Sequence, residues 1–156
     1  MSDTAEPVLT LVPSDEERQM REAVGGICAR YGRDYIREKV QTGEPPSELW
    51  DELAGHGYLG VNIPVAYGGA GLGMLELSAV AEEVAAAGCS LLLIVVSPAI
   101  VGTILAKHGT EEQKQRWLCG IGAGTTKIAS RSPSRTPAPI PITSRPRWCA
   151  TAPATC

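Results

Sequence analysis

The chain has 156 residues, 44% of them hydrophobic, and a formal net charge of −3. This length suits one domain with a buried core, and the small net charge excludes a nucleic-acid-binding arm or a polybasic membrane patch as the organising feature. Five cysteines without a C-x-x-C pair or zinc-ligand spacing predict neither a disulfide framework nor a metal site, and they favour reduced thiols in the cytoplasm. The acidic N-terminus has no apolar segment of the signal-peptide type.

The first half of the chain is predicted to be helical after a flexible leader over residues 1–13. Ser14 and Glu17 form a capping box that starts the first helix. Its apolar residues keep helical spacing to Tyr31 and on toward Ile36, with glycines at positions 25, 26 and 32 expected to weaken and bend it. A short amphipathic helix around Trp50 follows, and the glycine-rich stretch 58–73 predicts a structured loop.

The second half contains a long uncharged run over residues 84–106. A run of this length could span a bilayer, but Gly88, Pro98 and Gly102 interrupt it. We therefore interpret it as the end of a helix that begins at Met74, followed by a buried central helix. A second capping box, Thr110 with the glutamine three residues later, opens the last helix. No strand pattern occurs before residue 130, so the predicted fold class is an all-α bundle.

Histidines and cysteines are scattered along these helices. Each histidine lies beside a helix-ending glycine, which favours a role at a helix C-terminus over catalysis. The cysteines before the tail have no base nearby in sequence, which favours small buried hydrophobic residues over nucleophiles. These residues are His56, His108, Cys28, Cys89 and Cys119.

Two further patterns invite a functional interpretation. The glycine run Gly68–Gly73 lacks the Lys-Ser/Thr of a phosphate-binding loop, so a tight chain reversal is the better interpretation. Glu82 and Glu83 are adjacent on a helix and do not converge as an acid–base pair would, which favours a solvated or capping role. No catalytic, cofactor-binding or metal-binding residue is therefore expected.

Residues 130–156 differ in composition from the rest of the chain. They contain no Asp or Glu, four of the arginines and prolines at positions 133, 137, 139, 141, 146 and 153. Such proline density disfavours helices and central strands alike. We expect a disordered tail after Ala129.

Several motifs before the tail, taken together, resemble the N-terminal helical domain of acyl-CoA dehydrogenases over residues ~14 to 129. They are L-W-x-x-L-x-x-x-G-Y-x-G from residue 49, I-P-x-x-Y-G-G from residue 63, V-A-E-E from residue 80 and H-G-T-E-E-Q-K from residue 108. Members of this family are more than twice as long, with a β-domain and a second helical domain that carry the flavin contacts and the catalytic glutamate. The resemblance therefore implies a fragment of the enzyme.

The resemblance implies α,β-dehydrogenation of acyl-CoA thioesters in fatty-acid or related catabolism. A glutamate removes the α-proton while a hydride passes from Cβ to FAD, and the protein orients the substrate. The helical domain would supply an apolar wall for the acyl chain, and this chain alone would retain neither FAD nor activity. An alternative is a helical subunit that joins a second chain carrying the flavin and base sites, or that forms a homo-oligomer. The expected wall residues are Leu92, Val95, Val96, Ala99 and Thr103.

A shifted reading frame of the tail is compatible with a sequence that resembles the same family. Read one base out of frame with GC-rich codons, the tail can encode F-A-I-T-E-P-D-A-G-S-N-S, which contains the T-E-P and A-G-S typical of the family's next segment. We interpret residues 130–156 as out-of-frame translation after the loss of one base. The alternative is a genuine disordered tail with a proline-rich binding function.

Overall fold

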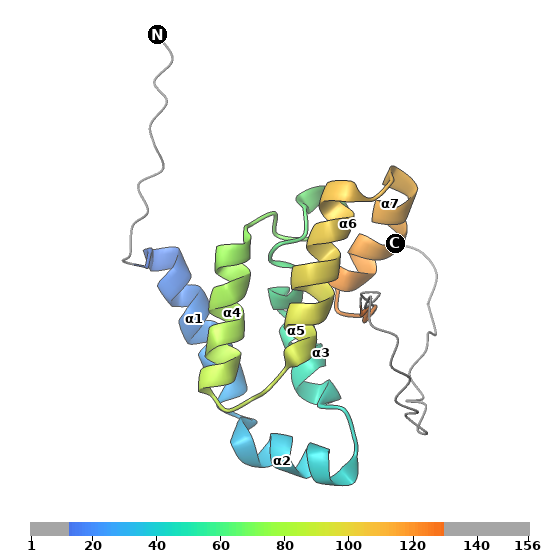
Figure 1. Ribbon diagram of the computed structural model, residues 1–156. Helices are drawn as coiled ribbons and strands as arrows, with labels where there is room; N and C mark the ends of the chain where they lie inside the picture. Colours follow the sequence, from blue (N-terminus) through green and yellow to red (C-terminus); the bar gives the residue numbers. More distant parts are fainter. Residues whose placement is uncertain (1–12, 130–156) are drawn as a thin grey trace, which may run out of the picture.

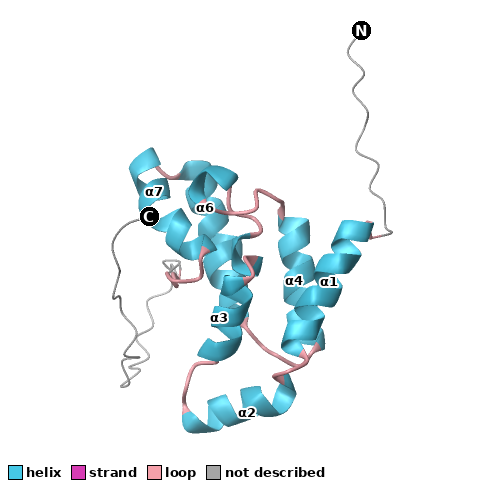
Figure 2. Ribbon diagram, turned by 180° about the vertical axis from the view of Figure 1, so that it is seen from behind, coloured by secondary structure: helices cyan, strands magenta, loops and turns pink. Residues whose placement is uncertain are grey.

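The computed structural model describes residues 13–129, which form helices joined by short loops (Figures 1 and 2). No strand occurs in this range, so the predicted all-α fold is confirmed. The predictions for the leader and for the tail lie outside the described residues, except at residue 13. The elements are α1 (Asp15–Cys28), α2 (Gly32–Thr42), α3 (Ser47–Gly55), η1 (Tyr58–Gly60), η2 (Val65–Tyr67), α4 (Met74–Ala86), α5 (Leu92–Ile94), η3 (Val95–Gly102), α6 (Thr103–His108) and α7 (Glu111–Gly122).

The first predicted helix is in fact two helices, α1 and α2. The Ser14 hydroxyl accepts a hydrogen bond from the backbone amide of Glu17 at 3.1 Å, as the capping box predicted. The helix then ends at Cys28, and α2 begins at Gly32 with a φ of 69°. Glycine adopts this left-handed conformation without the steric cost that a side chain brings. The chain therefore breaks at a point across which the apolar spacing continues.

Helices α1 and α4 lie side by side in both views (Figures 1 and 2). One cation joins their polar sides: the Arg21 guanidinium lies 3.0 Å from Glu17, 2.8 Å from Glu82 and 3.1 Å from Glu83. Glu82 and Glu83 thus have a structural role here, in agreement with their interpretation as something other than an acid–base pair.

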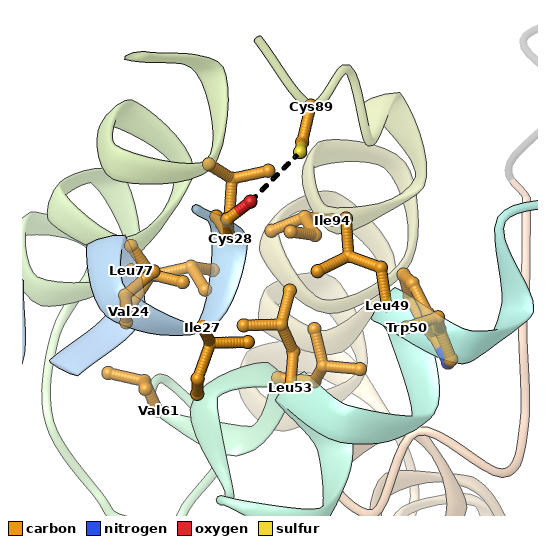
Figure 3. Close-up of a cluster of buried hydrophobic side chains, with 13 residues drawn as sticks. Val24, Ile27, Cys28, Leu49, Trp50, Leu53, Val61, Leu77, Cys89 and Ile94 are labelled. Atoms are coloured by element: carbon orange, nitrogen blue, oxygen red, sulfur yellow. Dashed lines mark hydrogen bonds between the residues drawn. The ribbon is translucent and has the colours of Figure 1, made fainter. Parts of the chain in front are cut away.

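The main core lies between α1, α3, α4 and the start of α5. Figure 3 shows side chains from these elements converging, with Ile27 of α1 close to Leu53 of α3. Burial of this apolar surface is the main force that holds the helices together. The buried members of this first core cluster are Val24, Ile27, Cys28, Leu49, Trp50, Leu53, Leu59, Val61, Leu77, Val80, Val84, Cys89 and Ile94.

A smaller second core cluster joins α7 to the central helix and to the loop after η1. Its buried members are Ile63, Val101, Leu118 and Ile121. Gly60 and Gly122 pass each other so closely that a Cβ on Gly60 would lie 2.9 Å from the Gly122 carbonyl oxygen. The missing side chain at position 60 therefore lets η1 approach the backbone of α7.

The uncharged run over residues 84–106 is divided in the structure. Helix α4 ends at Ala86, and Gly88, with a φ of 80°, lies in the turn before α5. Within residues 13–129, no helix is both long and apolar enough to cross a membrane. The division of the run into two helix segments is confirmed, but the prediction that the second segment is buried is wrong, since its residues Leu92 and Ile104 are 71% and 51% exposed.

Candidate functional site

Elements α5, η3 and α6 follow one another without a break and form a single rod over residues 92–108 (yellow to gold in Figure 1). The middle segment, η3, is a π-helix and contains Pro98. Proline has no N–H to donate and its ring crowds the preceding turn, so it disrupts regular α-helix. A wider π-turn inside a helix frequently marks a functional position.

The five predicted wall residues all lie on this rod, with different exposures. Leu92 is 71% exposed and Val95 is 42% exposed, whereas Val96, Ala99 and Thr103 are half-buried. Ala99 also packs partly against the first core cluster. The side chains of the two most exposed residues can therefore contact an apolar partner, whereas those of the other three lie partly at the surface and partly in the core.

Two further apolar residues of the rod are exposed, and the sequence did not point to them. Ile100 is 42% exposed and Ile104 is 51% exposed. With Leu92 and Val96 they form a series spaced by four residues, which drifts around an ordinary α-helix of 3.6 residues per turn. A π-helix closes its turns one residue later, so it turns less per residue and keeps such a series closer to one side. The spacing by four residues is visible in the sequence, but it places these residues on one side of the rod only because the middle of the rod is a π-helix.

We call the solvent-facing side of the rod the wall face. It consists of Leu92, Val95, Val96, Ile100, Thr103 and Ile104. An exposed apolar surface of this kind marks a site where another apolar surface or ligand packs.

A polar contact lies behind Thr103. The Asn62 side chain donates from Nδ2 to the Pro98 carbonyl oxygen at 2.8 Å and to the Thr103 hydroxyl at 3.2 Å. The Thr103 hydroxyl in turn lies 3.5 Å from the Met74 sulfur. Asn62 therefore fixes the loop before η2 against the wide turn of the rod, and Met74 extends the apolar surface beside Thr103.

The chain returns to the rod after α7. The indole N–H of Trp50 donates to the Gly124 carbonyl oxygen at 2.8 Å, and the backbone amide of Ile128 donates to the Ser97 hydroxyl at 3.2 Å. Ser97 is fully buried in the middle of η3. The described chain therefore ends beside the centre of the rod.

A hollow of about 190 Å³ lies between the start of α3 and the start of the rod. Its lining is mostly apolar, and the Lys127 ammonium lies 5.2 Å from the centre of the Trp50 ring. Leu92 belongs both to this hollow and to the wall face, so the hollow continues the apolar surface at one end. The lining residues are Pro45, Pro46, Ser47, Trp50, Ser90, Leu91, Leu92, Leu93 and Lys127.

The two histidines lie at helix ends. His108 is the last residue of α6, and His56 follows α3 and stacks on Tyr58 with ring centres 6.1 Å apart. Their predicted positions at helix C-termini are confirmed. Among the described residues, no group of three or more His, Cys, Asp or Glu side chains could hold a metal ion.

The fold and the site thus define an all-α domain with an apolar helix side turned to solvent. Residues 14–125 match the protein family described as "Acyl-CoA dehydrogenase, N-terminal domain". The chain belongs to the acyl-CoA dehydrogenase family, of which it contains this helical domain.

Known relatives agree with this assignment. The chain is 51% identical over 129 residues to acyl-CoA dehydrogenase FadE12 of Mycobacterium tuberculosis, which covers 83% of this chain and 32% of that protein. It is 33% identical over 118 residues to mitochondrial isovaleryl-CoA dehydrogenase of Pongo abelii, covering 71% of this chain and 27% of the relative. An acyl-CoA dehydrogenase structure from Geobacillus kaustophilus superposes with a TM-score of 0.66 at 26% identity, covering 73% and 30% of the two chains. The chain spans about a third of the length of these relatives.

Proposed function

We propose that residues 14–129 are the acyl-chain-covering domain of an FAD-dependent acyl-CoA dehydrogenase. The observation that carries this proposal is the wall face, an apolar helix side left without cover in a domain of this family. In the complete enzyme, Leu92 and Val95 would line the path of the acyl chain of the thioester, together with the half-buried Val96, Ala99 and Thr103. Their role is to bind the chain and to exclude water from it.

We further propose that the 156-residue chain has no dehydrogenase activity by itself. Removal of an α-proton needs a carboxylate or another base within hydrogen-bond reach of the substrate. The rod carries no Asp or Glu between Leu92 and His108. The wall face therefore offers an apolar surface without a carboxylate.

The hollow beside Trp50 does not fit FAD. It is smaller than the roughly 300–1,000 Å³ of typical ligand sites. Its polar side chains are Ser47, Ser90 and Lys127, and Lys127 already lies over the Trp50 ring. This set supplies too few donors for a dinucleotide diphosphate together with a flavin ring. We propose that the flavin of the family is bound by parts of the enzyme outside this chain.

We propose that residues 130–156 arise from out-of-frame translation. This proposal rests on the family segment that the neighbouring reading frame can encode.

We also propose a cytoplasmic location for the protein. This proposal rests on the odd number of cysteines, which lack the spacing of a disulfide framework.

Restoring the reading frame tests the main proposal. Insertion of one base after codon 129 is expected to give a longer chain that purifies yellow and oxidises an acyl-CoA in the presence of an electron acceptor. The 156-residue chain prepared in parallel is expected to be colourless and inactive. A frame-restored chain that folds but holds no flavin would contradict the proposal.

The second candidate function is a helical subunit completed by a separate chain. The exposure of the wall face favours it, since a partner would bury this apolar surface. Mixing the 156-residue chain with a polypeptide made from the downstream frame is expected to produce a yellow complex if this candidate is correct. Two colourless chains that elute separately would exclude it while leaving the frame-restoration result intact.

A further inference from the structure

Two buried cysteines meet where α1 ends and the turn after α4 begins. Cys28 is the last residue of α1, and Cys89 lies just before α5, 61 residues further along the chain. The Cys89 sulfur lies 3.8 Å from the Cys28 carbonyl oxygen and 3.8 Å from the Gly32 carbonyl oxygen. Figure 3 shows the Cys89 side chain pointing toward the end of α1.

The backbone at both cysteines can adjust to a covalent link. Cys28 lies at a helix end and Cys89 in a turn, and both side chains are buried in the first core cluster, with the Cys89 sulfur against the backbone of Cys28. A disulfide needs the two sulfurs at about 2 Å and the two Cβ atoms at about 4 Å. Closing the link requires the turn at Cys89 and the end of α1 to adopt this geometry.

We propose that Cys28 and Cys89 are an oxidation site, at which a peroxide converts the two thiols into a disulfide that ties α1 to the turn before the rod. Two S–H bonds break and one S–S bond forms as the thiols lose two electrons and two protons. Hydrogen peroxide takes up these electrons and protons, its O–O bond breaks, and two water molecules leave. This site is independent of the wall face and of the proposed dehydrogenase function.

The environment of the pair makes the reaction slow under ordinary conditions. Burial raises the pKa of the Cys28 thiol to about 11 and also raises the pKa of the Cys89 thiol. Because the thiolate is the reacting form, little of it is present at neutral pH. The rate of oxidation is therefore expected to increase with pH, and both thiols remain reduced unless an oxidant is present.

The disulfide is expected to stabilise the fold. It would close a long loop of the unfolded chain and so reduce the entropy of the unfolded state. We expect the melting temperature to rise by about 5 °C or more on oxidation and to fall back on treatment with dithiothreitol.

The test uses the full 156-residue chain with Cys119→Ser, Cys149→Ser and Cys156→Ser, so that only Cys28 and Cys89 keep thiols. Hydrogen peroxide is added in native buffer, and thiols are counted after denaturation. The expected result is loss of both thiols, a monomer lighter by about 2 Da for the two hydrogens, a linked pair of peptides and the higher melting temperature. The matched control adds Cys89→Ala, which should abolish the internal link and the rise in melting temperature.

Peptide mapping of the oxidised wild-type chain provides the second measurement. In native buffer the pair Cys28–Cys89 is expected to dominate, whereas oxidation in urea should give mixed pairs among the five cysteines. Thiols that persist in the folded chain, or that gain oxygen one by one without linking, would overturn the proposal. A wild-type map dominated by another pair would overturn it equally, even if the substituted chain does not fold.

Discussion

At the scale of single residues, Asn62 supports the unusual part of the rod. Its Nδ2 atom donates to a carbonyl oxygen and to a hydroxyl on two successive turns, while its Oδ1 atom is buried and has no hydrogen-bond partner within the described residues. A buried acceptor of this kind carries a free-energy cost. The two donated bonds therefore have to offset it, so the side chain is a sensitive point for substitution.

Replacing Asn62 tests this role. Asn62→Ala removes both hydrogen bonds and leaves the Pro98 carbonyl oxygen with one donor fewer, so we expect the free energy of unfolding to fall by about 1–2 kcal/mol. Urea unfolding measures this change. The control is Ser78→Ala on the exposed side of α4, where the hydroxyl bonds to the Met74 carbonyl oxygen at 2.8 Å, and its effect should stay within about 0.5 kcal/mol. Equal effects of the two substitutions would contradict the account.

Glu48 makes the contact between α2 and α3 depend on pH. The Lys39 ammonium at 2.8 Å and the Tyr35 hydroxyl at 2.6 Å stabilise the ionised form, and they lower the pKa of Glu48 from 4.5 to about 2. The unfolded chain therefore takes up a proton at higher pH than the folded chain does. This contribution to stability is complete above about pH 4.5 and is lost as the pH falls toward 2.

The variant Glu48→Gln isolates this contribution. Its urea midpoint is expected to lie below that of the wild type near pH 6, and the difference should shrink steadily between about pH 4.5 and pH 2. Asp51→Asn, three residues further along α3, serves as the control for the loss of one carboxylate from this helix. If the difference between wild type and Glu48→Gln does not change with pH, the contribution of Glu48 comes from the packing of its side chain and not from its charge.

At the scale of elements, the central rod is where sequence and structure differ most. The sequence predicts the helix, and the family resemblance implies five wall residues around its Pro98 interruption. The wide turn at Pro98 changes the α-helical spacing and brings Ile100 and Ile104 to the exposed side. A proline inside a helix signals a disruption, but it does not say whether the chain bends, breaks or widens. That outcome depends on contacts such as the one from Asn62.

Dye binding tests the wall face as an element. Leu92→Gln combined with Ile104→Gln removes two exposed apolar side chains, so binding of a hydrophobic dye should fall several-fold while the melting temperature changes little. The control is Val40→Gln on α2, since Val40 is 76% exposed and lies on a different element. Its dye binding should equal that of the wild type. An equal loss of dye binding in both variants would mean that the wall face is not the surface that binds the dye.

At the scale of the whole molecule, local chemistry was enough to predict the helical domain. The capping boxes at Ser14 and Thr110 place the starts of α1 and α7 correctly, because a cap is formed by residues close in sequence. Helix α7 extends to Gly122, and the chain breaks before Gly32, where the sequence predicts a bend. Both depend on packing between elements far apart in the chain, which no short pattern encodes.

Truncation tests where the folded domain ends. A chain that stops after Ala129 keeps every described contact, so its free energy of unfolding should lie within about 0.5 kcal/mol of that of the 156-residue chain. A chain that stops after Ala123 loses the acceptor of the Trp50 indole and the donor to Ser97, and it should be less stable by about 2–4 kcal/mol. Urea unfolding of the three chains decides the matter. A large loss on removal of residues 130–156 would show that the tail belongs to the fold.

The central claim is that this chain is the helical third of a flavin enzyme and cannot hold the cofactor by itself. The most direct test is the flavin absorption band of the 156-residue chain after incubation with excess FAD and removal of the free cofactor, followed by addition of an acyl-CoA and an electron acceptor. We predict no retained flavin and no reduction of the acceptor. A chain that stays yellow and reduces the acceptor when the acyl-CoA is added would contradict the account.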